Sequence, residues 1–202
     1  MLASDMAPTR SAVLQLREEH EVILEAYDFL DEKRLLLAAE LLRQLKQYED
    51  NIRQYEALRE KAEHALVASV KRHGLQGTQV YPGHYLENAV LRSENTLFMG
   101  VSLTTTGLNI SEEILKQSTC HPSPEAEACR ELFQRLVSLA AVVAGISGNL
   151  HRLLEEYRRT ERRARALENV VIPEMSHTLR EMSTQLEELD QEDIVRVHLK
   201  HK

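Results

Sequence analysis

The side chains best suited to chemistry are arginines that crowd one stretch of the chain. The stretch RRTERRARALENVVIPEM, residues 158–175, holds five of them: Arg158, Arg159, Arg162, Arg163 and Arg165. Guanidinium groups form strong, charge-assisted hydrogen bonds to carboxylates and phosphates. The cluster is therefore either a basic surface for an acidic partner or a solvated face partly balanced by Glu155, Glu156 and Glu161. The spacing of the arginines does not choose between these two interpretations.

Sequence patterns for catalysis, cofactors and metals are absent. The chain contains no GxxxxGK[ST] stretch for a nucleotide phosphate, and no GxSxG, HExxH or CxxC. Cys120 and Cys129 have no metal or redox spacing, which predicts two reduced thiols. His198 and His201 are the closest histidine pair and lie near the chain end, a poor setting for a metal. We expect no catalytic residue, no cofactor and no metal site.

Composition narrows the classes of partner. The net charge is -7 with acids and bases interleaved, which argues against binding to nucleic acid. No apolar run approaches the ~18 residues of a membrane span, and no secretory leader is visible. The sequence therefore predicts a cytoplasmic chain that does not insert into the membrane directly.

Apolar residues at intervals of three, four and seven predict a long helix over residues 9–73, which contain no glycine or proline and are flanked by Pro8 and Gly74. The same spacing recurs over residues 123–202 and predicts a second long helix, which Gly145 and Gly148 weaken locally. The first apolar seam is Val13, Leu16, Ile23, Tyr27, Leu30, Leu37, Leu41, Leu45, Tyr48, Ile52, Tyr55, Leu58, Ala62 and Leu66, with His20 and Arg34 at two further seam positions. The second includes Leu132, Leu136, Leu139, Val143, Ile146, Leu150, Leu153, Tyr157, Ala164, Leu167, Val171 and Met175.

Two single-seam helices at opposite ends of one chain can bury their seams against each other. The predicted fold class is all-α: a long antiparallel two-helix coiled coil with a small glycine-containing middle segment. The first helix would be roughly 97 Å long, whereas a compact chain of this length is on the order of 40 Å across. We therefore predict one elongated, rod-like domain over residues 1–202, made of segments 9–73, 74–122 and 123–202.

The middle segment, residues 74–122, is expected to fold the chain back. Its glycines and β-branched residues favour a short β-hairpin, with strands at TQVY and TLFMGVSLT, followed by a helical turn at SEEILKQ.

Pro173 interrupts the second helix without an obvious stop signal. A proline in a helix interior costs about 3 kcal/mol, but Ile172 would make a poor N-cap for a new helix. The apolar spacing 4-4-4 from Leu167 to Leu179 also changes the phase of the seam. We predict a kinked but continuous helix with Pro173 opposite Tyr27. The alternative is a new helix that begins at Pro173.

Three segments together resemble the D subunit of the V/A-type ATPases. RRARALENVVIP is similar to an Arg-rich A-L-E-x-V-x-I-P signature, APTRSAVLQLREE to the family's opening, and FLDEKRLLLAAELL to an internal K-R-x-x-L segment. Arg165 departs from an expected asparagine and Leu35 from a frequent acid. The resemblance spans nearly the full chain and implies a non-catalytic central-stalk subunit that couples ATP hydrolysis or synthesis to rotation and to proton or sodium ion transport.

The resemblance also implies partners. These are the catalytic and non-catalytic A and B subunits of the ring, the F subunit of the stalk, and a funnel-shaped subunit that links to the membrane ring, in a complex peripheral to the membrane. The hypothetical contacts with the ring are Arg10, Arg158, Arg162, Arg163 and Pro173. The F subunit is expected near residues 48–66 and 132–150, where apolar residues exceed one seam, with contacts at Tyr48, Ile52, Tyr55, Leu136 and Val143.

Two other classes remain open on the residues alone. A free-standing coiled-coil scaffold or tether would associate through its seam without ATPase subunits. A compact four-helix ligand-binding bundle would need breaks within residues 9–73.

Overall fold

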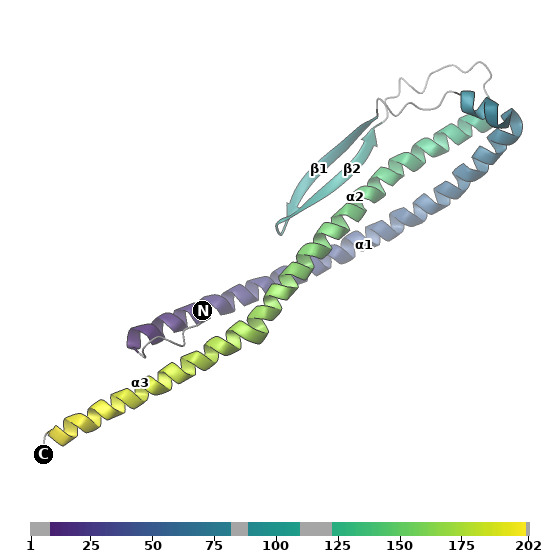
Figure 1. Ribbon diagram of the computed structural model, residues 1–202. Coiled ribbons are helices and arrows are strands. Elements are labelled where there is room, and N and C mark those ends of the chain that lie inside the picture. Colours follow the sequence, from purple (N-terminus) through teal and green to yellow (C-terminus); the bar gives the residue numbers. More distant parts are fainter. Residues whose placement is uncertain (1–8, 82–88, 110–122, 201–202) are drawn as a thin grey trace. The chain divides into compact units, whose positions relative to one another are not determined.

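Long helices make up most of the protein, and one strand pair accompanies them. The computed structural model describes residues 9–81, 89–109 and 123–200. The elements are α1 Arg10–Val80, β1 Val90–Phe98, β2 Val101–Asn109, α2 Pro124–Ala166, the π-helical turn η3 Leu167–Val171, and α3 Ile172–Lys200 (Figure 1). The predicted fold class, two long helices with a small β-hairpin between them, is confirmed.

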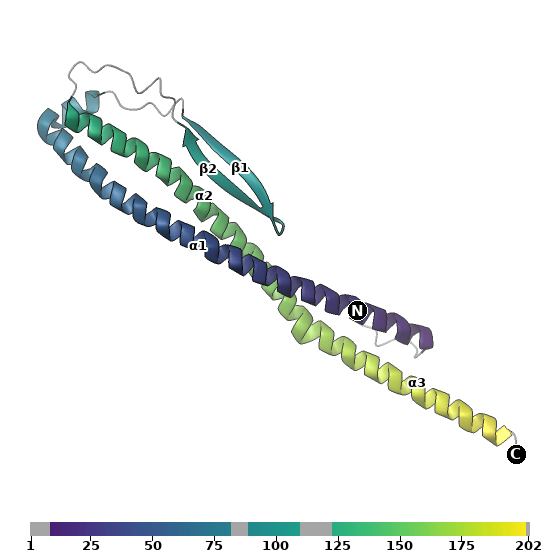
Figure 2. The same cartoon turned by 180° about the vertical axis from the view of Figure 1, so that it is seen from behind.

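The chain divides into two compact units. The terminal unit comprises Met1–Leu36 and Tyr157–Lys202, and the middle unit comprises Leu37–Glu156. Within each unit the early part of the chain lies antiparallel beside the late part (Figures 1 and 2). Polar cross-links show this pairing: Arg10 with Asp190 and His20 with Ser176 in the terminal unit, and Arg72 with Glu125 in the middle unit. The antiparallel pairing is confirmed within each unit, and the single rod-like domain stays a prediction.

Gly74 breaks the first helix where the prediction ended it. Its φ of 72° and ψ of 169° lie outside the helical range, in a region that residues with a Cβ rarely enter. The chain then returns to helical geometry up to Val80, and the Thr78 hydroxyl donates to the Gly74 carbonyl at 2.9 Å. The predicted strand at TQVY is therefore wrong, because local hydrogen bonding extends the helix through residues 78–80.

The α1 seam follows the predicted spacing for most of its length. Leu16, Leu37 and Ala62 are buried, for example. The exceptions are Leu45 and Leu66, which are 43% and 38% exposed; Gln44, beside Leu45, is only 6% exposed. A glutamine thus holds the seam position that was predicted for a leucine. The prediction failed because burial depends on which face of the helix a residue occupies. On the buried face here stands Gln44, whose side chain is hydrogen-bonded to Glu40.

A serine caps the start of α2. The Ser123 hydroxyl accepts a hydrogen bond from the backbone N–H of Ala126 at 3.2 Å, and Pro124 is the first helical residue. Both are favoured at a helix N-terminus, since the cap satisfies a free N–H and proline has none to satisfy. His73 Nε2 lies 2.7 Å from the same hydroxyl, and Arg72 binds Glu125 at 2.8 Å. These bonds tie the end of the long α1 run to the start of α2.

The helix continues through Pro173, as predicted, but by way of a π-helical turn. α2, η3 and α3 follow one another without a break, and Ile172 has helical φ and ψ of -62° and -47°. Its N–H reaches back five residues to the Leu167 carbonyl. A wider turn just before Pro173 accommodates its ring and missing N–H. A new helix beginning at Pro173 is excluded, because Ile172 is helical and cannot be its N-cap.

The terminal unit has a small apolar core made by both of its helical segments. Its buried members are Ala12, Val13, Leu16, Met175 and Met182, with Ile23, Val171 and Leu179 packed against them. The His20–Ser176 contact at 3.0 Å places the turn that holds Pro173 closer to Ile23 than to the predicted Tyr27. The shift is about one helical turn.

The strand pair is a tight hairpin with a two-residue loop. Phe98 pairs with Val101, and between them Met99 and Gly100 have φ values of 48° and 84°. Positive φ at both loop positions is the pattern whose twist matches the flanking strands. The predicted strand TLFMGVSLT is therefore wrong as one strand, since it contains this loop. The predicted helical turn SEEILKQ lies outside the described residues.

Candidate interaction surfaces

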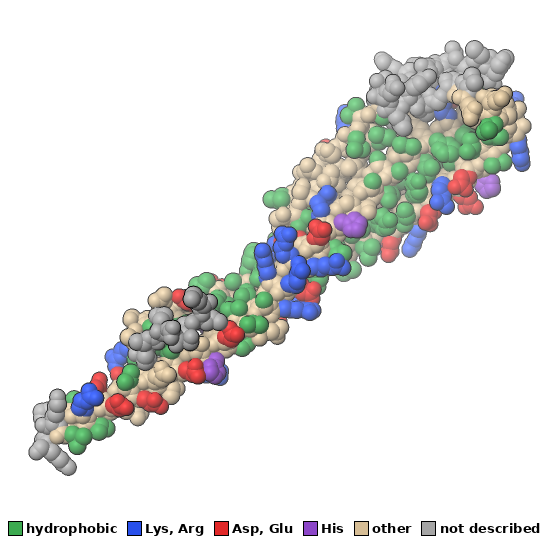
Figure 3. Space-filling model, viewed as in Figure 1, with side chains coloured by type: hydrophobic (Ala, Val, Ile, Leu, Met, Phe, Trp, Pro, Cys, Tyr) green, Lys and Arg blue, Asp and Glu red, His purple; other side chains and the backbone are tan. Residues whose placement is uncertain are grey.

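The arginine cluster, defined as Arg158, Arg159, Arg162, Arg163 and Arg165, lies on the exposed side of its helix. All five side chains are exposed, while Thr160 and Ala164 between them are buried. Figure 3 shows basic side chains gathered on this stretch. Arg165 binds Glu161 at 2.6 Å. Within the described part of the chain, Arg158, Arg162 and Arg163 form no ion pair, so these three guanidinium groups are available to a partner.

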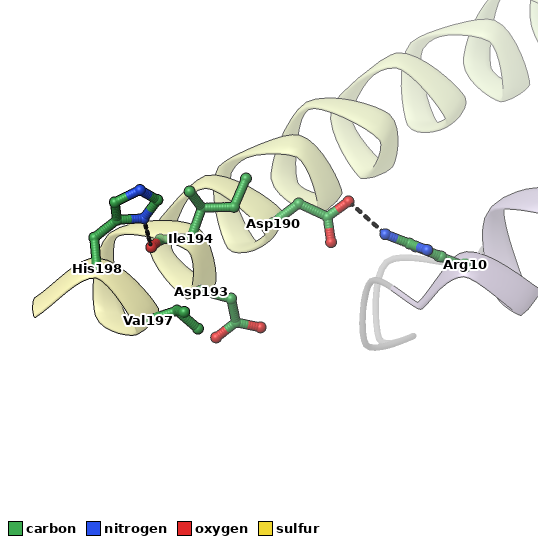
Figure 4. Close-up of a pocket in the computed structure, with 6 residues that line it drawn as sticks. All are labelled: Arg10, Asp190, Asp193, Ile194, Val197 and His198. Carbon is green, nitrogen blue, oxygen red and sulfur yellow. Dashed lines mark hydrogen bonds and ion pairs between the residues drawn. The ribbon is translucent and has the colours of Figure 1, made fainter. Parts of the chain in front are cut away.

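Arg10, also predicted to contact the ring, binds within its own unit. Its guanidinium donates to Asp190 at 2.9 Å, and both side chains remain largely exposed. The pair borders a shallow pocket of about 450 Å³ at the end of α3, which is lined by Arg10, Asp190, Asp193, Ile194, Val197 and His198 (Figure 4). An exposed ion pair of this kind contributes at most about 1 kcal/mol. Arg10 can therefore exchange this carboxylate for a partner's carboxylate at small cost.

An apolar groove opens in the middle unit between α1 and α2. Its volume is about 320 Å³, and its lining is Leu41, Leu42, Leu45, Tyr48, Ser147, Leu150, His151 and Leu154. Leu42 is 68% exposed. Leu42 and Leu154 lie outside the predicted seams and, with the exposed Leu45, make an apolar surface of the kind on which an amphipathic helix docks. The sequence signal that could have indicated this groove is two pairs of adjacent leucines, Leu41–Leu42 and Leu153–Leu154. Adjacent residues cannot both lie on one seam, so one leucine of each pair lies off it.

Buried polar residues explain why the leucines face outward here. Glu40 and Gln44 take the buried positions on this part of α1. The Glu40 carboxylate accepts hydrogen bonds from Arg43 at 2.6 and 2.7 Å and from Gln44 Nε2 at 2.9 Å. The Arg43 hydrogen bonds lower the pKa of Glu40 below its usual range, and burial opposes them. The Glu40 carboxylate therefore stays ionised. Because Glu40 and Gln44 occupy the buried face, Leu42 and Leu45 are exposed and can contact a partner.

The residues predicted to contact the F subunit differ in the surface they offer. Tyr48, Ile52 and Tyr55 on α1 and Val143 on α2 are half-buried. Leu136 is only 8% exposed and belongs to the core. Of these residues, Tyr48 lines the groove. The predicted contact region and the groove thus meet at Tyr48, and all five contacts with the F subunit stay predictions.

The side-chain amide of Asn149 on α2 binds the backbone of β2 in the hairpin. Asn149 Oδ1 accepts from the Thr104 N–H at 2.8 Å, and Asn149 Nδ2 donates to the Thr104 carbonyl at 3.0 Å. Arg152 donates to both Asn149 Oδ1 and the Thr104 hydroxyl, at 2.6 and 3.0 Å. Asn149 therefore satisfies the backbone of β2 as a neighbouring strand would, and it is buried.

A glycine in α2 permits this close approach. The Thr106 hydroxyl donates to the Ala141 carbonyl at 2.6 Å. A Cβ added to Gly145 would lie 2.2 Å from the Thr106 hydroxyl oxygen, whereas at Gly148 the nearest atom would be at 3.7 Å. Gly145 was expected to weaken the helix. The close approach of Thr106 explains why a glycine nevertheless stands at this position. The sequence signal was a glycine inside an otherwise strong helical pattern.

Metal and thiol chemistry find little support in the residues that the structure describes. No group of three His, Cys, Asp or Glu side chains in these residues could hold a metal ion. Cys129 is buried, and burial raises the pKa of its thiol, which makes it a poor nucleophile. Cys120 and His201 lie outside the described residues.

One helical stretch corrects the expectation about apolar runs. By length and composition, Pro124–Leu199 contains a window of 18 residues apolar enough to cross a membrane. Only 17% of that window is buried. Length and composition do not separate a membrane span from a helix whose outer face packs on protein. Most of this apolar window is therefore not buried within the described part of the chain.

These features define a class of protein: a helical interaction subunit whose arginine cluster and apolar groove suit protein partners. The chain belongs to the D-subunit family of ATP synthases, whose model matches residues 12–200. It is 25% identical to the D subunit of the V-type ATP synthase of Thermotoga neapolitana over 98% of both chains. It is 27% identical to the D subunit of the A-type ATP synthase of Archaeoglobus fulgidus, over 96% of this chain and 95% of that one. The D subunit of the V-type ATP synthase of Thermus thermophilus is 28% identical over 96% of this chain and 86% of that one.

Proposed function

We propose that the chain is the central-stalk, or rotor axle, component of a V/A-type ATPase and carries no catalytic residue of its own. The observation that carries this proposal is the arginine cluster, set outward on an antiparallel helix pair in a chain of the D-subunit family. The axle couples ATP hydrolysis or synthesis in a ring of A and B subunits to rotation, and rotation to proton or sodium ion transport. Its place is in the complex at the membrane surface.

The coupling follows from differential contact. A non-catalytic chain changes the state of a distant nucleotide site only if it binds one state of that site better than another. The basic side of the terminal unit carries Arg158, Arg162 and Arg163, so the axle presents a different surface to each catalytic site around it. A guanidinium enclosed by the ring is partly desolvated, and its hydrogen bonds to carboxylates are then stronger. Arg10 and Pro173 lie in the same unit and complete the proposed ring contact.

The middle unit is proposed to bind the F subunit of the stalk. The groove offers a surface for an apolar helix face, and Tyr48, Ile52 and Tyr55 extend it along α1. Leu136 and Val143 support this surface from α2. The funnel-shaped subunit that links to the membrane ring would join the same end of the assembly.

Reconstitution with the purified ring of A and B subunits tests the ring contact. The triple variant R158E/R162E/R163E should fold, because all three side chains are exposed. It should bind the ring more weakly, and ATP-driven rotation should become more sensitive to salt. A matched control reverses three arginines elsewhere on exposed faces: Arg17, Arg53 and Arg196. Unchanged ring binding and unchanged rotation in the triple variant would show that the cluster is a solvated face and not a ring contact.

Two further measurements test the placement of the F subunit and the axle shape. Leu42→Asp should weaken binding of the F subunit and leave ring binding unchanged, whereas Leu14→Asp, at an exposed position of the terminal unit, should not affect binding of the F subunit. If the Leu42→Asp variant still bound the F subunit with full affinity, the proposal that this subunit binds in the groove would be wrong. Small-angle X-ray scattering tests the rod, and a radius of gyration near ~17 Å would contradict it. Co-purification with ATPase subunits separates the axle from a free-standing coiled-coil scaffold.

A further inference from the structure

Among the residues that the structure describes, none pairs with the outer edge of β1, whose backbone N–H and C=O groups form an open ladder. In a hairpin with a two-residue loop, the closing pair Phe98–Val101 exchanges hydrogen bonds and alternate pairs do so thereafter. The pairs between them point their N–H and C=O groups away from the hairpin. Thr104 belongs to this outward set, and its backbone groups are the ones that Asn149 binds. On β1 the corresponding outward residues are Leu91, Ser93, Asn95 and Leu97.

The two edges of the hairpin are therefore not equivalent. The β2 edge is occupied by Asn149 of α2, which also fixes the orientation of the hairpin. Every residue of β1 except Phe98 is exposed, including the apolar Leu91 and Leu97. Natural edge strands are blunted by proline, by charged side chains (lysine above all), by bulges or by short length, and the charged residues of β1 are Arg92 and Glu94, which have opposite signs. β1 is nine residues long, pairs without a bulge, and contains no proline, lysine or glycine.

Its charges suggest which strand it would accept. Arg92 and Glu94 are exposed and form no ion pair within the described residues. Arg92 stands opposite Gly107 in the hairpin, so no side chain on β2 covers it. Consider a second copy of β1 laid antiparallel about a twofold axis through Ser93. The outward groups of Leu91, Ser93 and Asn95 then meet outward groups of the second copy.

This register also matches the charges. Arg92 stands directly opposite Glu94 of the second copy, and by symmetry Glu94 opposite its Arg92. Opposite charges in directly facing positions stabilise a sheet, and like charges destabilise it. A twofold axis through Glu94 instead sets the two Glu94 carboxylates against each other. An axis through Arg92 sets the two guanidinium groups together, so the charges favour the axis at Ser93.

We propose that two free copies of this chain associate through their β1 strands, antiparallel about Ser93, to form a four-stranded sheet closed by two Arg92–Glu94 pairs. Such an interface is self-complementary, as a twofold dimer requires. It differs from association through the helical seam, since the seam stays buried within each copy. The proposal does not depend on the rotor function, because it concerns the chain without its partner subunits.

Sedimentation velocity of the full chain, under reducing conditions and over a concentration series, tests the pairing. The wild-type chain should show a reversible monomer–dimer equilibrium. Arg92→Glu and Glu94→Arg should each weaken it by roughly tenfold or more, because each creates two like-charge pairs per dimer. A mixture of the two single variants should dimerise again, since the introduced glutamate of one copy then faces the introduced arginine of the other. The double variant R92E/E94R should also dimerise by itself.

Hydrogen exchange locates the interface. Protection of the Leu91, Ser93 and Asn95 amides should rise with protein concentration in the wild-type chain and not in Arg92→Glu. A wild-type chain that stays monomeric would overturn the proposal. So would a dimer that both single charge reversals leave intact, which would assign association to another surface. If the β1 amides gain protection only when ATPase subunits are added, the edge binds a strand of one of those subunits and self-pairing is wrong.

Discussion

The terminal unit and the middle unit use the same pair of helices in different ways. The terminal core is apolar, and among the described residues its buried polar groups are the Thr160 side chain and the Ser183 hydroxyl. The middle unit buries several: Glu40, Gln44, Ser69, Ser123 and Asn149. Apolar packing has little directional preference, whereas hydrogen bonds fix positions. The middle unit is thus the more tightly specified of the two, and the terminal unit depends on volume and burial.

The difference accounts for where partner surfaces arise. In the middle unit, polar residues occupy buried positions and leave leucines outside, which creates the groove. In the terminal unit, apolar residues occupy the seam and arginines are left outside. Two kinds of surface, one apolar and one basic, therefore come from one helical pattern. Four predictions test this contrast, from the largest expected effect to the smallest.

The first concerns the apolar core of the terminal unit. Leu16 is 8% exposed, and Leu16→Ala should destabilise the unit by about 2–5 kcal/mol. Leu14 is 58% exposed, and Leu14→Ala should change stability by less than about 0.5 kcal/mol. Hydrogen exchange should show lost protection in the terminal unit of Leu16→Ala, with the Thr104 amide still protected. If both units lost protection equally, the two units would not be separately stabilised.

A second test uses the glycines of α2. Gly145→Ala should undock β2 or strain α2 at a cost of about 1–3 kcal/mol, because its Cβ would meet Thr106. Gly148→Ala has ordinary space around it and should stabilise the helix by up to about 1 kcal/mol. Thermal unfolding and exchange of the Thr104 amide measure both. The two variants are expected to change stability in opposite directions. If both changed it in the same direction, the close contact with Thr106 would not be the reason for the glycine at position 145.

The third prediction addresses how the terminal helices keep their register. Ser176→Ala removes the bond to His20 and should cost about 0.5–1.5 kcal/mol. Because apolar packing alone specifies register weakly, exchange of amides in residues 12–20 should also become faster. Thr184 bonds only within its own helix, at the Arg180 carbonyl, so Thr184→Ala is the control. No difference between the two variants would show that the apolar core sets the register without help.

The smallest effect is expected from pH. The lowered pKa of Glu40 means that the folded chain favours its carboxylate. This contribution is present above the ordinary glutamate pKa of about 4.3 and is lost as the pH falls through and below that range. Glu40→Gln should be less stable than the wild-type chain at neutral pH, and the gap should close in acid. Glu49→Gln, at an exposed glutamate, is the control for the substitution itself and should change stability by less than about 0.5 kcal/mol at neutral pH. If the stability difference between the wild-type chain and Glu40→Gln persisted in acid, it would come from the geometry of the side chain and not from its charge.

Periodicity predicted the helices well because it reports a physical necessity. Residues three and four apart share one face, so the seams of α1 and α2 could be predicted from the spacing of residues such as Leu16, Leu37 and Leu153. The break at Gly74 was also predictable, since few residues adopt its φ. Gln44 could not be anticipated, because its burial depends on hydrogen bonds with Glu40. Apolar spacing carries no information about such partners.

The hairpin and the groove were harder to predict for a related reason. The pairing of Asn149 with Thr104 joins residues far apart in the chain, and no local pattern near Asn149 indicates it. The predicted strand TLFMGVSLT contains the Met99–Gly100 loop and so covers parts of both strands, and the predicted strand TQVY lies largely within α1. For the arginine cluster, exposure followed from the seam, whereas the identity of its partner rests on family membership and remains a proposal.

The π-helical turn before Pro173 has a consequence for how the chain tolerates changes in length. A π turn forms where a helix holds one residue more than its regular ladder needs. Deleting one residue within Leu167–Val171 should therefore leave both flanking faces in step and restore a uniform helix. A deletion in α2 would instead rotate everything beyond it by about 100°. It would carry Met175 and Met182 out of the core. Insertions and deletions among relatives should therefore gather at this turn.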